Sequence, residues 1–288
     1  MDKKTVKKVL LVLFLILIAL VVGIIFTEPY SIKHETIQQT MKDAVLHNEN
    51  KVSFLGILDV NPSLISAYAV TGIILVFALI IRITVIPKFK MIPGKFQMLL
   101  EAWVGLFDGL AKSNSPHRNK ALGAYIFTAG SYIFIGTMFE LFGFQAITTA
   151  GHSVSLPAPL ADINGAIAMG CMSYLFIMSG GIAGNKVKGI FKTIKEFSLP
   201  VSMSFRLFGA LLSGMLVTEL VYYLLFLSFV LPVVVGVLFT VLHAIIQAYV
   251  LTMLTSVYYG EVSEVHEKKP KEPKKNKSKK SEPEAQAA

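Results

Sequence analysis

The chain has 288 residues, of which 54% are hydrophobic and 16% charged, and its mean hydropathy is +0.63. This composition is typical of a polytopic membrane protein and excludes a soluble domain built around one large core. The single cysteine, Cys171, lies in an apolar run, which excludes a disulfide within the chain and predicts a buried, inert thiol. A formal net charge of +9 is compatible with nucleic-acid binding, but the distribution of the charge indicates another origin.

The first apolar run, residues 9–26, follows the basic start MDKKTVKK. It is longer than the core of a secretory signal peptide, which has about 7–15 residues, and no A-x-A-like cleavage site follows it. These features favour a retained transmembrane helix over a cleaved signal peptide. A polar, mildly acidic segment follows as far as Pro62.

Five further apolar stretches are long enough to cross a bilayer, which needs about 20 residues. They cover residues 64–86, 121–139, 165–183, 199–229 and 233–259. Pro232 stands between the last two stretches, where it fits the turn of a helical hairpin.

The segments between these spans differ in character. Residues 95–112 carry apolar side chains at helical spacing with polar ones among them, which predicts an amphipathic helix at the membrane surface. Residues 140–161 are predicted to be a loop that ends in PAPLADIN. The sequence NKVKGIFKTIKEF, which begins at residue 185, is predicted to be a short basic loop.

Basic residues are distributed unevenly between these segments. If six spans alternate in direction, 22 Lys and Arg residues fall on one side of the membrane and 3 on the other. Such a bias predicts that both termini are cytoplasmic and that the positive charge sets the topology. The Lys/Pro/Glu-rich tail is predicted to be disordered, and it lacks the interleaved aromatic residues that would favour nucleic-acid binding.

Arg206 lies inside the fifth predicted span. A charge at the bilayer centre costs about 2.5–3.5 kcal/mol on insertion scales, and arginine does not lose its proton in proteins. The residue therefore needs a partner, a water-filled cavity or a function, unless its head snorkels to the headgroups. Glu219 follows thirteen residues later on nearly the opposite helix face, so the two are not a local ion pair.

The sixth predicted span carries His243 and Gln247, which share one helix face because they are four residues apart. Glu219 and His243 each lie ten residues from the predicted hairpin turn, so they are expected at similar depth on facing helices. Membrane proton relays are built from such groups. The alternative is that His243 only packs and that Glu219 pairs with a tyrosine.

The sequence SFRLFG at 204–209, followed by IQAYVLTMLTSVYYGE at 246–261, resembles subunit a of the F-type ATP synthase. The stretches PGKFQ and PAPLADIN, at 93–97 and 157–164, support the resemblance, which covers roughly residues 64–261. It implies an all-α integral membrane protein of six hydrophobic helices, an extra N-terminal span plus five. Its long C-terminal hairpin packs against the c-ring, and one amphipathic helix lies on the cytoplasmic surface.

The domain organisation follows from the spans and this resemblance. We expect an N-terminal transmembrane helix at 1–27, an extracytoplasmic loop at 28–63, the a-subunit membrane domain at 64–260 and a basic cytoplasmic tail at 261–288.

The resemblance implies an ion-translocating stator subunit that is not an enzyme by itself. Two offset half-channels load and unload ions on c-ring carboxylates and so couple the ion gradient to ATP synthesis. Arg206 matches the family's essential arginine, and Gln247 matches the glutamine of the last helix. A fixed cation keeps a facing carboxylate ionised and repels cations in transit.

The sequence departs from the family pattern in the outer half-channel. Ala210, Met215 and Thr240 stand where many members have Asn, Glu, and His or Glu. Glu219 and His243 each lie about one turn away from the positions of the missing groups. Counting from the hairpin turn also places Gln247 level with Met215, whereas the family has this glutamine near the arginine.

The candidate residues form two groups. Those expected to act in ion translocation are Arg206, Glu219, His243 and Gln247. Further candidates for lining the outer half-channel are Asp162, Asn164, Ser213 and Thr240.

The implied partners are the c-subunit ring, the b subunits of the peripheral stalk, the lipid bilayer and the transported H⁺, with Na⁺ left open. We expect a multi-pass protein of the bacterial plasma (inner) membrane, with no cofactor, no bound metal and no nucleic acid. The alternatives are a sodium-coupled version of the same subunit, a secondary transporter that uses Arg206 as an anion site, and a membrane scaffold. A transporter is disfavoured because no convincing internal repeat is present.

Overall fold

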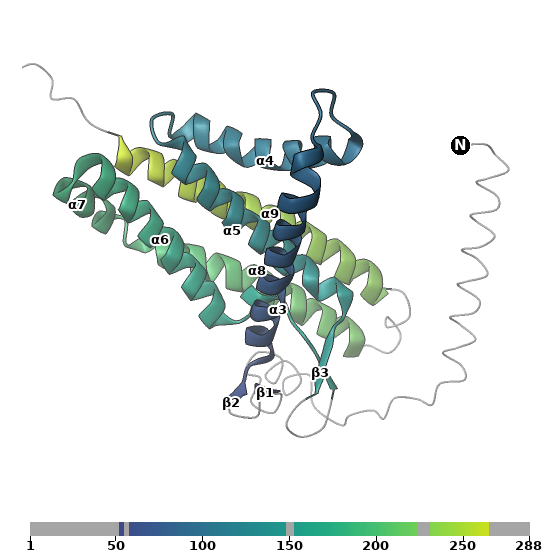
Figure 1. Cartoon of the computed structure of the whole chain (residues 1–288). Coiled ribbons are helices and arrows are strands. Elements are labelled where there is room, and N and C mark those ends of the chain that lie inside the picture. Colours follow the sequence, from purple (N-terminus) through teal and green to yellow (C-terminus); the bar gives the residue numbers. More distant parts are fainter. Residues whose placement is uncertain (1–51, 55–57, 148–152, 224–230, 265–288) are drawn as a thin grey trace, which may run out of the picture. The chain divides into compact units, whose positions relative to one another are not determined.

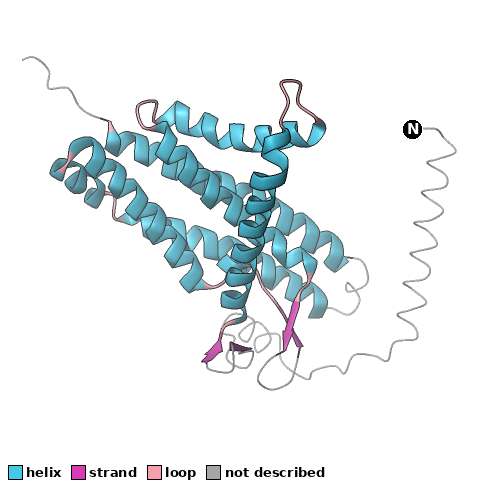
Figure 2. Cartoon of the chain, viewed as in Figure 1, coloured by secondary structure: helices cyan, strands magenta, loops and turns pink. Residues whose placement is uncertain are grey.

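The computed structural model describes residues 52–54, 58–147, 153–223 and 231–264. The predicted N-terminal span and the basic tail lie outside these residues. Helices make up most of the described part of the chain (Figures 1 and 2). Its α-helices are α3 (Pro62–Ile80), α4 (Lys95–Asn114), α5 (Asn119–Phe139), α6 (Ile163–Asn185), α7 (Val187–Lys195), α8 (Ser198–Tyr223) and α9 (Leu231–Ser263).

Short elements connect or extend these helices. The helical ones are η1 (Ile81–Val85), η2 (Ile86–Lys88), η3 (Glu140–Phe142) and η4 (Pro159–Ala161). The strands are β1 (Val52–Phe54), β2 (Leu58–Val60), β3 (Gln145–Ile147) and β4 (Ser153–Ser155). They form two antiparallel hairpins, β1 with β2 and β3 with β4. Both hairpins lie in segments that were predicted to be loops, so they leave the helical class unchanged.

Four of the described helical segments are long and apolar enough to cross a membrane. They are Pro62–Lys88, Asn119–Phe142, Ile163–Asn185 and Val233–Ser263. They coincide with the second, third, fourth and sixth predicted spans, and α8 takes the place of the fifth. The prediction of an all-α membrane protein is therefore confirmed. The layout with six spans and the c-ring packing stay predictions.

Helix α9 is packed between α5 and α6, and the register of each pair follows from glycines at the contacts. A Cβ on Gly130 of α5 would lie 2.9 Å from Cγ2 of Thr252 in α9. Buried Leu122 of α5 belongs to the same apolar cluster as Val262 near the end of α9, so these two helices are antiparallel. Gly180 and Gly184 of α6 abut Tyr259 and Ser263 of α9, so α6 and α9 run parallel.

Helix α8 lies closely against α6 because the contact is made by small residues. A Cβ on Gly170 of α6 would lie 2.8 Å from the carbonyl oxygen of Pro200 and would also overlap the hydroxyl of Ser204. Small residues at helix contacts allow close approach in membranes, where apolar burial between helices supplies little driving force. One apolar cluster then joins α8 to α9 and α5, and it includes Leu207, Leu211 and Leu251.

The helix predicted over residues 95–112 is confirmed as α4, and its place at the membrane surface stays a prediction. Phe107 and Ala111 are buried on the side that faces α5 and α9. The indole Nε1 of Trp103 donates a hydrogen bond to the hydroxyl of Ser131 in α5 at 3.0 Å. The other faces of α4 are largely exposed, and they carry apolar side chains such as Leu99 and Leu106 as well as polar ones.

Polar side chains join three helix ends at what we call the capped end, formed by the start of α5 and the ends of α6 and α9. Arg118 donates to the carbonyl oxygen of Ala183 at 2.5 Å. The amide of Asn185 donates to the carbonyl oxygens of Val262 and Glu264 at 2.9 and 2.8 Å. These donors satisfy carbonyls that the last turn of a helix leaves without intrahelical partners.

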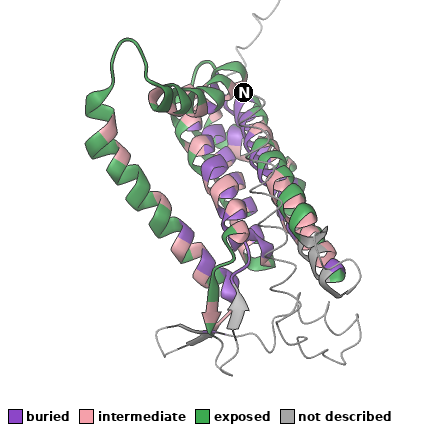
Figure 3. Cartoon of the chain, turned by 90° about the vertical axis from the view of Figure 1, so that its right-hand side faces the viewer, coloured by how far each residue is buried: buried purple, intermediate pink, exposed green. Residues whose placement is uncertain are grey.

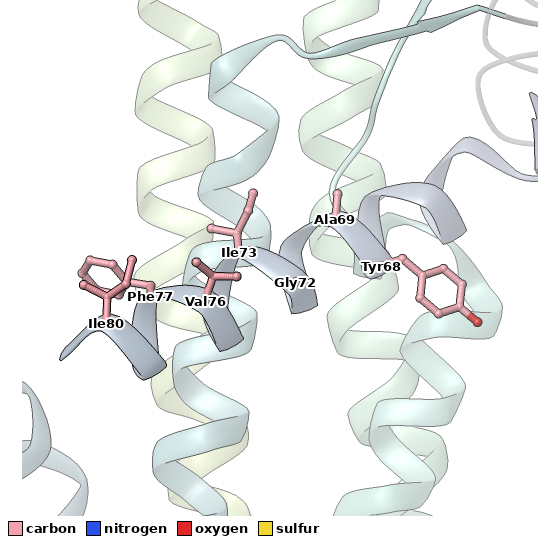
Figure 4. Close-up of a pocket in the computed structure, with 7 residues that line it drawn as sticks. All are labelled: Tyr68, Ala69, Gly72, Ile73, Val76, Phe77 and Ile80. Carbon is pink, nitrogen blue, oxygen red and sulfur yellow. The ribbon is translucent and has the colours of Figure 1, made fainter. Parts of the chain in front are cut away.

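Helix α3 leaves the bundle along most of its length, as its exposed surface in Figure 3 shows. Ser66 and Val70 are buried, but a Cβ on Gly72 would meet no atom within 4 Å. An open apolar groove runs along the helix, and Figure 4 shows its lining from Tyr68 to Ile80. Because this lining is entirely apolar apart from Tyr68, the groove lacks the groups that ion transfer needs.

The structure corrects one prediction about a loop and one about burial. The segment predicted as a short basic loop contains helix α7, because its apolar and basic residues each recur at helical spacing. Cys171, predicted to be buried, is exposed on α6. An apolar environment in the sequence does not imply burial here, because the lipid-facing surface of a membrane helix is apolar as well.

Candidate functional site

Helix α8 has two unlike faces. Met203, Leu207 and Leu211 are buried against the other helices. The other face is a stripe of exposed residues, which we call the arginine face: Ser202, Arg206, Gly209 and Ser213. Apart from the arginine, these four residues are small, and the large side chains of Val201 and Phe205 are exposed beside them.

The guanidinium of Arg206 is exposed and has neither a hydrogen bond nor an ion pair with residues that the structure describes. The neighbouring hydroxyl of Ser213 is turned back onto its own helix, where it donates to the carbonyl oxygen of Ala210 at 2.8 Å. An exposed arginine in an apolar helix, unpaired among the described residues, is expensive at membrane depth, which indicates a partner or a role beyond those residues.

The register of α8 against α9 places the other candidates relative to Arg206. A Cβ on Gly214 of α8 would lie 3.2 Å from Nδ1 of His243 in α9. Because the two helices are antiparallel, Gln247 is level with Ala210, one turn from Arg206. Gln247 is also buried. Along the helix axis, Gln247 and Arg206 are therefore about one turn apart.

Counting from the predicted turn placed Gln247 level with Met215, and this prediction was wrong by about five residues. The count assumed a tight turn around Pro232. Helix α9 instead begins at Leu231, so Pro232 belongs to its first turn, where a proline removes no intrahelical hydrogen bond.

His243 contacts the ring of Phe239 edge to face, with ring centroids 5.7 Å apart. Thr240, one turn before it, is half-buried. Glu219 lies in α8 five residues beyond Gly214, which is about 7.5 Å along the helix axis. The count from the predicted turn placed Glu219 and His243 at equal depth, and this register contradicts that expectation. The side chain of Glu219 lies outside the described part of the structure, so its pairing with His243 stays a prediction.

Glu140 is an acidic residue that the sequence analysis assigned only to a loop. It begins η3 directly after α5, and η3 packs against α9. Gly130 contacts Thr252, so Glu140, ten residues further along antiparallel α5, is level with Leu242 and His243. It is half-buried. The signal that could have found it is the acidic residue placed directly after an apolar span.

The PAPLADIN segment is largely buried and leads into the start of α6. Its 3₁₀ turn, η4, is fully buried and contacts α3, α5, α6 and α8. Asp162, the N-cap residue of α6, is half-buried, and Asn164 is exposed. Gly170 lies against Ser204 in an antiparallel helix pair, so Asn164 is level with Ala210.

The candidates therefore lie at two heights beyond Arg206. Asn164, Ala210 and Gln247 share the nearer height, and Glu140 and His243 share the one about a turn further along α8. Within the described ranges there is no group of three or more His, Cys, Asp or Glu side chains that could hold a metal ion. The polar groups at these heights come from four elements, α6, η3, α8 and α9.

Comparisons with known protein sequences identify the family of the chain. The sequence matches the family described as ATP synthase A chain over residues 65–260. A protein of Vibrio campbellii named ATP synthase subunit a 2 is 25% identical over 254 residues, which cover 78% of this chain and 99% of that protein. The matched range includes Arg206, Gln247 and both hairpin helices up to Gly260.

Proposed function

Because the chain belongs to the ATP synthase A chain family, we propose that it is the stator channel subunit in which Arg206 separates two half-channels. The chain is then a non-catalytic part of the synthase that moves ions across the membrane. One observation carries the proposal: Arg206 is exposed on α8 in line with Ser202, Gly209 and Ser213, and it is unpaired within the described part of the chain.

The arginine face suits a surface that moves past it. Serines and glycine next to Arg206 offer little steric resistance, and a close approach removes water between the guanidinium and a carboxylate on the c-ring. A fixed cation then favours the ionised form of that carboxylate and so forces it to release its ion before it passes. The same charge repels cations that would otherwise leak directly between the half-channels.

The outer half-channel would follow the two heights of polar groups beyond Arg206. Glu140 and His243 form its outer level, with Glu219 further along α8, and Asn164 and Gln247 lead toward the arginine. Asp162, Ser213 and Thr240 are further lining candidates. Where α8 carries Met215 in place of the glutamate that many members have, Glu140 supplies a carboxylate at that height from α5.

The remaining expectations complete the proposal. The partners are the c-subunit ring, the b subunits of the peripheral stalk and the lipid bilayer, and the transported ion is H⁺ with Na⁺ as the alternative. The 22-to-3 distribution of basic residues supports cytoplasmic termini in a bacterial plasma membrane.

The test compares two arginines of this chain in the assembled synthase. Arg206→Ala should abolish ATP-driven ion pumping into sealed vesicles while the soluble head still hydrolyses ATP. Arg118→Ala, the matched control, removes a helix-capping contact and should retain pumping. Arg206→Lys should rescue poorly, because a lysine ammonium is positioned differently and can lose its proton.

A second variant separates the arginine face from folding. A Cβ on Gly209 would meet no atom of this chain within 4 Å. Gly209→Leu should therefore leave the fold intact and still impair pumping, because the added side chain projects toward the ring. Near-normal pumping in Arg206→Ala vesicles would refute the proposal.

A further inference from the structure

Helix α7 has an exposed apolar face. Val187, Phe191 and Ile194 recur at intervals of four and three residues, so they lie on one side of the helix. Their exposed fractions are 64%, 66% and 51%, and Phe197 just beyond the helix is 66% exposed. A contiguous apolar face of this kind marks a contact with lipid or with another protein.

The opposite side of α7 is fastened to α6. A Cβ on Gly189 would overlap the backbone of Gly181, and the hydroxyl of Tyr174 donates to the carbonyl oxygen of Thr193 at 3.1 Å. Lys186, with a φ of 53°, makes the sharp turn between the two helices. Helix α7 therefore folds back along the last turns of α6, a candidate membrane span, which places its apolar face beside the membrane.

A row of lysines flanks the apolar face. Lys188, Lys192 and Lys195 recur at the same intervals, about 100° around the helix from the apolar residues. Lys192 is engaged, because its ammonium donates to the carbonyl oxygen of Glu261 at 2.6 Å. Lys188 and Lys195 are exposed, have no acidic partner among the described residues, and lie about 10.5 Å apart along the axis.

We propose that α7 is a binding surface for anionic phospholipids. Its apolar face lies among acyl chains, and Lys188 and Lys195 bind the phosphates of the same leaflet. The boundary between headgroups and acyl chains offers anions and apolar contact within about 5–10 Å, which matches a helix with adjacent basic and apolar faces. Lysine suits this position because its stem is apolar and its head reaches the phosphates.

Helix α7 is joined to α8 by a very short linker. Only Glu196 and Phe197 separate α7 from the first residue of α8, so lipid bound to α7 fixes the start of the helix that carries Arg206. The binding surface itself does not depend on the role of Arg206, so the failure of one proposal leaves the other in place.

The experiment measures which lipids surround α7 in the assembled synthase. Phe191→Cys in a Cys171→Ser background is labelled with an environment-sensitive fluorophore and reconstituted into phosphatidylcholine vesicles with a minor fraction of phosphatidylglycerol. In parallel samples either the choline or the glycerol lipid carries a nitroxide quencher on its acyl chain. Quenching by the glycerol lipid should exceed its share of the membrane by about fivefold per lysine.

The double variant Lys188→Gln/Lys195→Gln should remove this preference, while Lys112→Gln on α4 should leave it unchanged. If the double variant does not assemble, the labelled protein with both lysines decides the question, because added salt should weaken the preference. Equal quenching by both lipids at low salt would overturn the proposal. Absence of quenching by either lipid would also overturn it and would indicate that a protein or water covers α7.

Discussion

The capped end and the arginine face use the same kinds of side chain in opposite ways. At the capped end, Arg118 and Asn185 donate to carbonyl oxygens of neighbouring helix ends, and Lys192 donates to α9. On the arginine face, Arg206 is exposed with no such contact to the described residues. Polar groups at the capped end hold the described helices together, whereas Arg206 is unpaired among the described residues and is proposed to meet the c-ring.

This contrast distinguishes polar side chains that stabilise the fold from polar side chains that act in ion transfer. A polar donor that satisfies helix carbonyls stabilises the fold, and removing it should lower stability without changing ion transfer. An unpaired cation on an apolar helix makes no hydrogen bond that stabilises the fold. Removing it should therefore change ion transfer without lowering stability. The predictions below test the two halves of this statement.

The largest loss of stability is expected at the close contact between α8 and α6. Gly170→Val places atoms against the carbonyl oxygen of Pro200, and the backbones must move apart. We expect a loss of about 3 kcal/mol in the free energy of unfolding, at the upper end for overpacked cores. The measurement is denaturant unfolding in detergent. Gly236→Val, at a position with no atom within 4 Å of the added Cβ, is the control and should be near neutral.

A smaller effect is expected at the capped end. Asn185→Ala removes two hydrogen bonds to the last turn of α9 and should destabilise that turn by about 1–2 kcal/mol. Hydrogen exchange at residues 260–264 should accelerate accordingly, while ATP-driven pumping per assembled complex stays unchanged. A strong loss of pumping in complexes that assemble normally would contradict the assignment of this end to structure.

Substitutions in the proposed outer half-channel should slow pumping modestly, and their effects should be coupled. Glu140→Gln and His243→Ala should each slow pumping without abolishing it, because water can still fill the path. If the two side chains act at one height, the double variant should be less impaired than the two losses combined, with a coupling of about 0.5 kcal/mol or more. Strict additivity would refute the coupling and leave Arg206 untouched. The same cycle with Glu219→Gln tests the predicted pairing of Glu219 with His243.

The smallest effect is expected on α4. Lys112 pairs with Asp108 at 2.5 Å, but both side chains are largely exposed. Exposed pairs of this spacing contribute about 0.3–0.5 kcal/mol. Lys112→Ala should therefore shift the unfolding midpoint only slightly and leave pumping unchanged. A large loss of stability would show that solvent screening at this surface is weaker than the contrast assumes.

Most of the helices could be predicted from the sequence, and the site residues that it indicates stay predictions. Apolar runs and helical spacing predicted α3, α4, α5, α6, α8 and α9, because these patterns are set by the membrane and by the helix repeat. The heights of Gln247 and His243 could not be predicted, because they depend on helix starts and on contacts such as Gly214 with His243. Glu140 was missed for the same reason, because its height relative to His243 depends on how α5 pairs with α9.

The central claim is that the arginine face meets the c-ring and the capped end does not, and cross-linking tests it most directly. In a Cys171→Ser background, Ser202→Cys and Ser213→Cys on the arginine face are each paired with single cysteines along the outer helix of the c subunit. Leu211→Cys on the buried face and Ala183→Cys at the capped end serve as controls. Disulfides that form from positions 202 and 213 alone are the predicted result, and cross-links from position 183 but not from the arginine face would contradict the account.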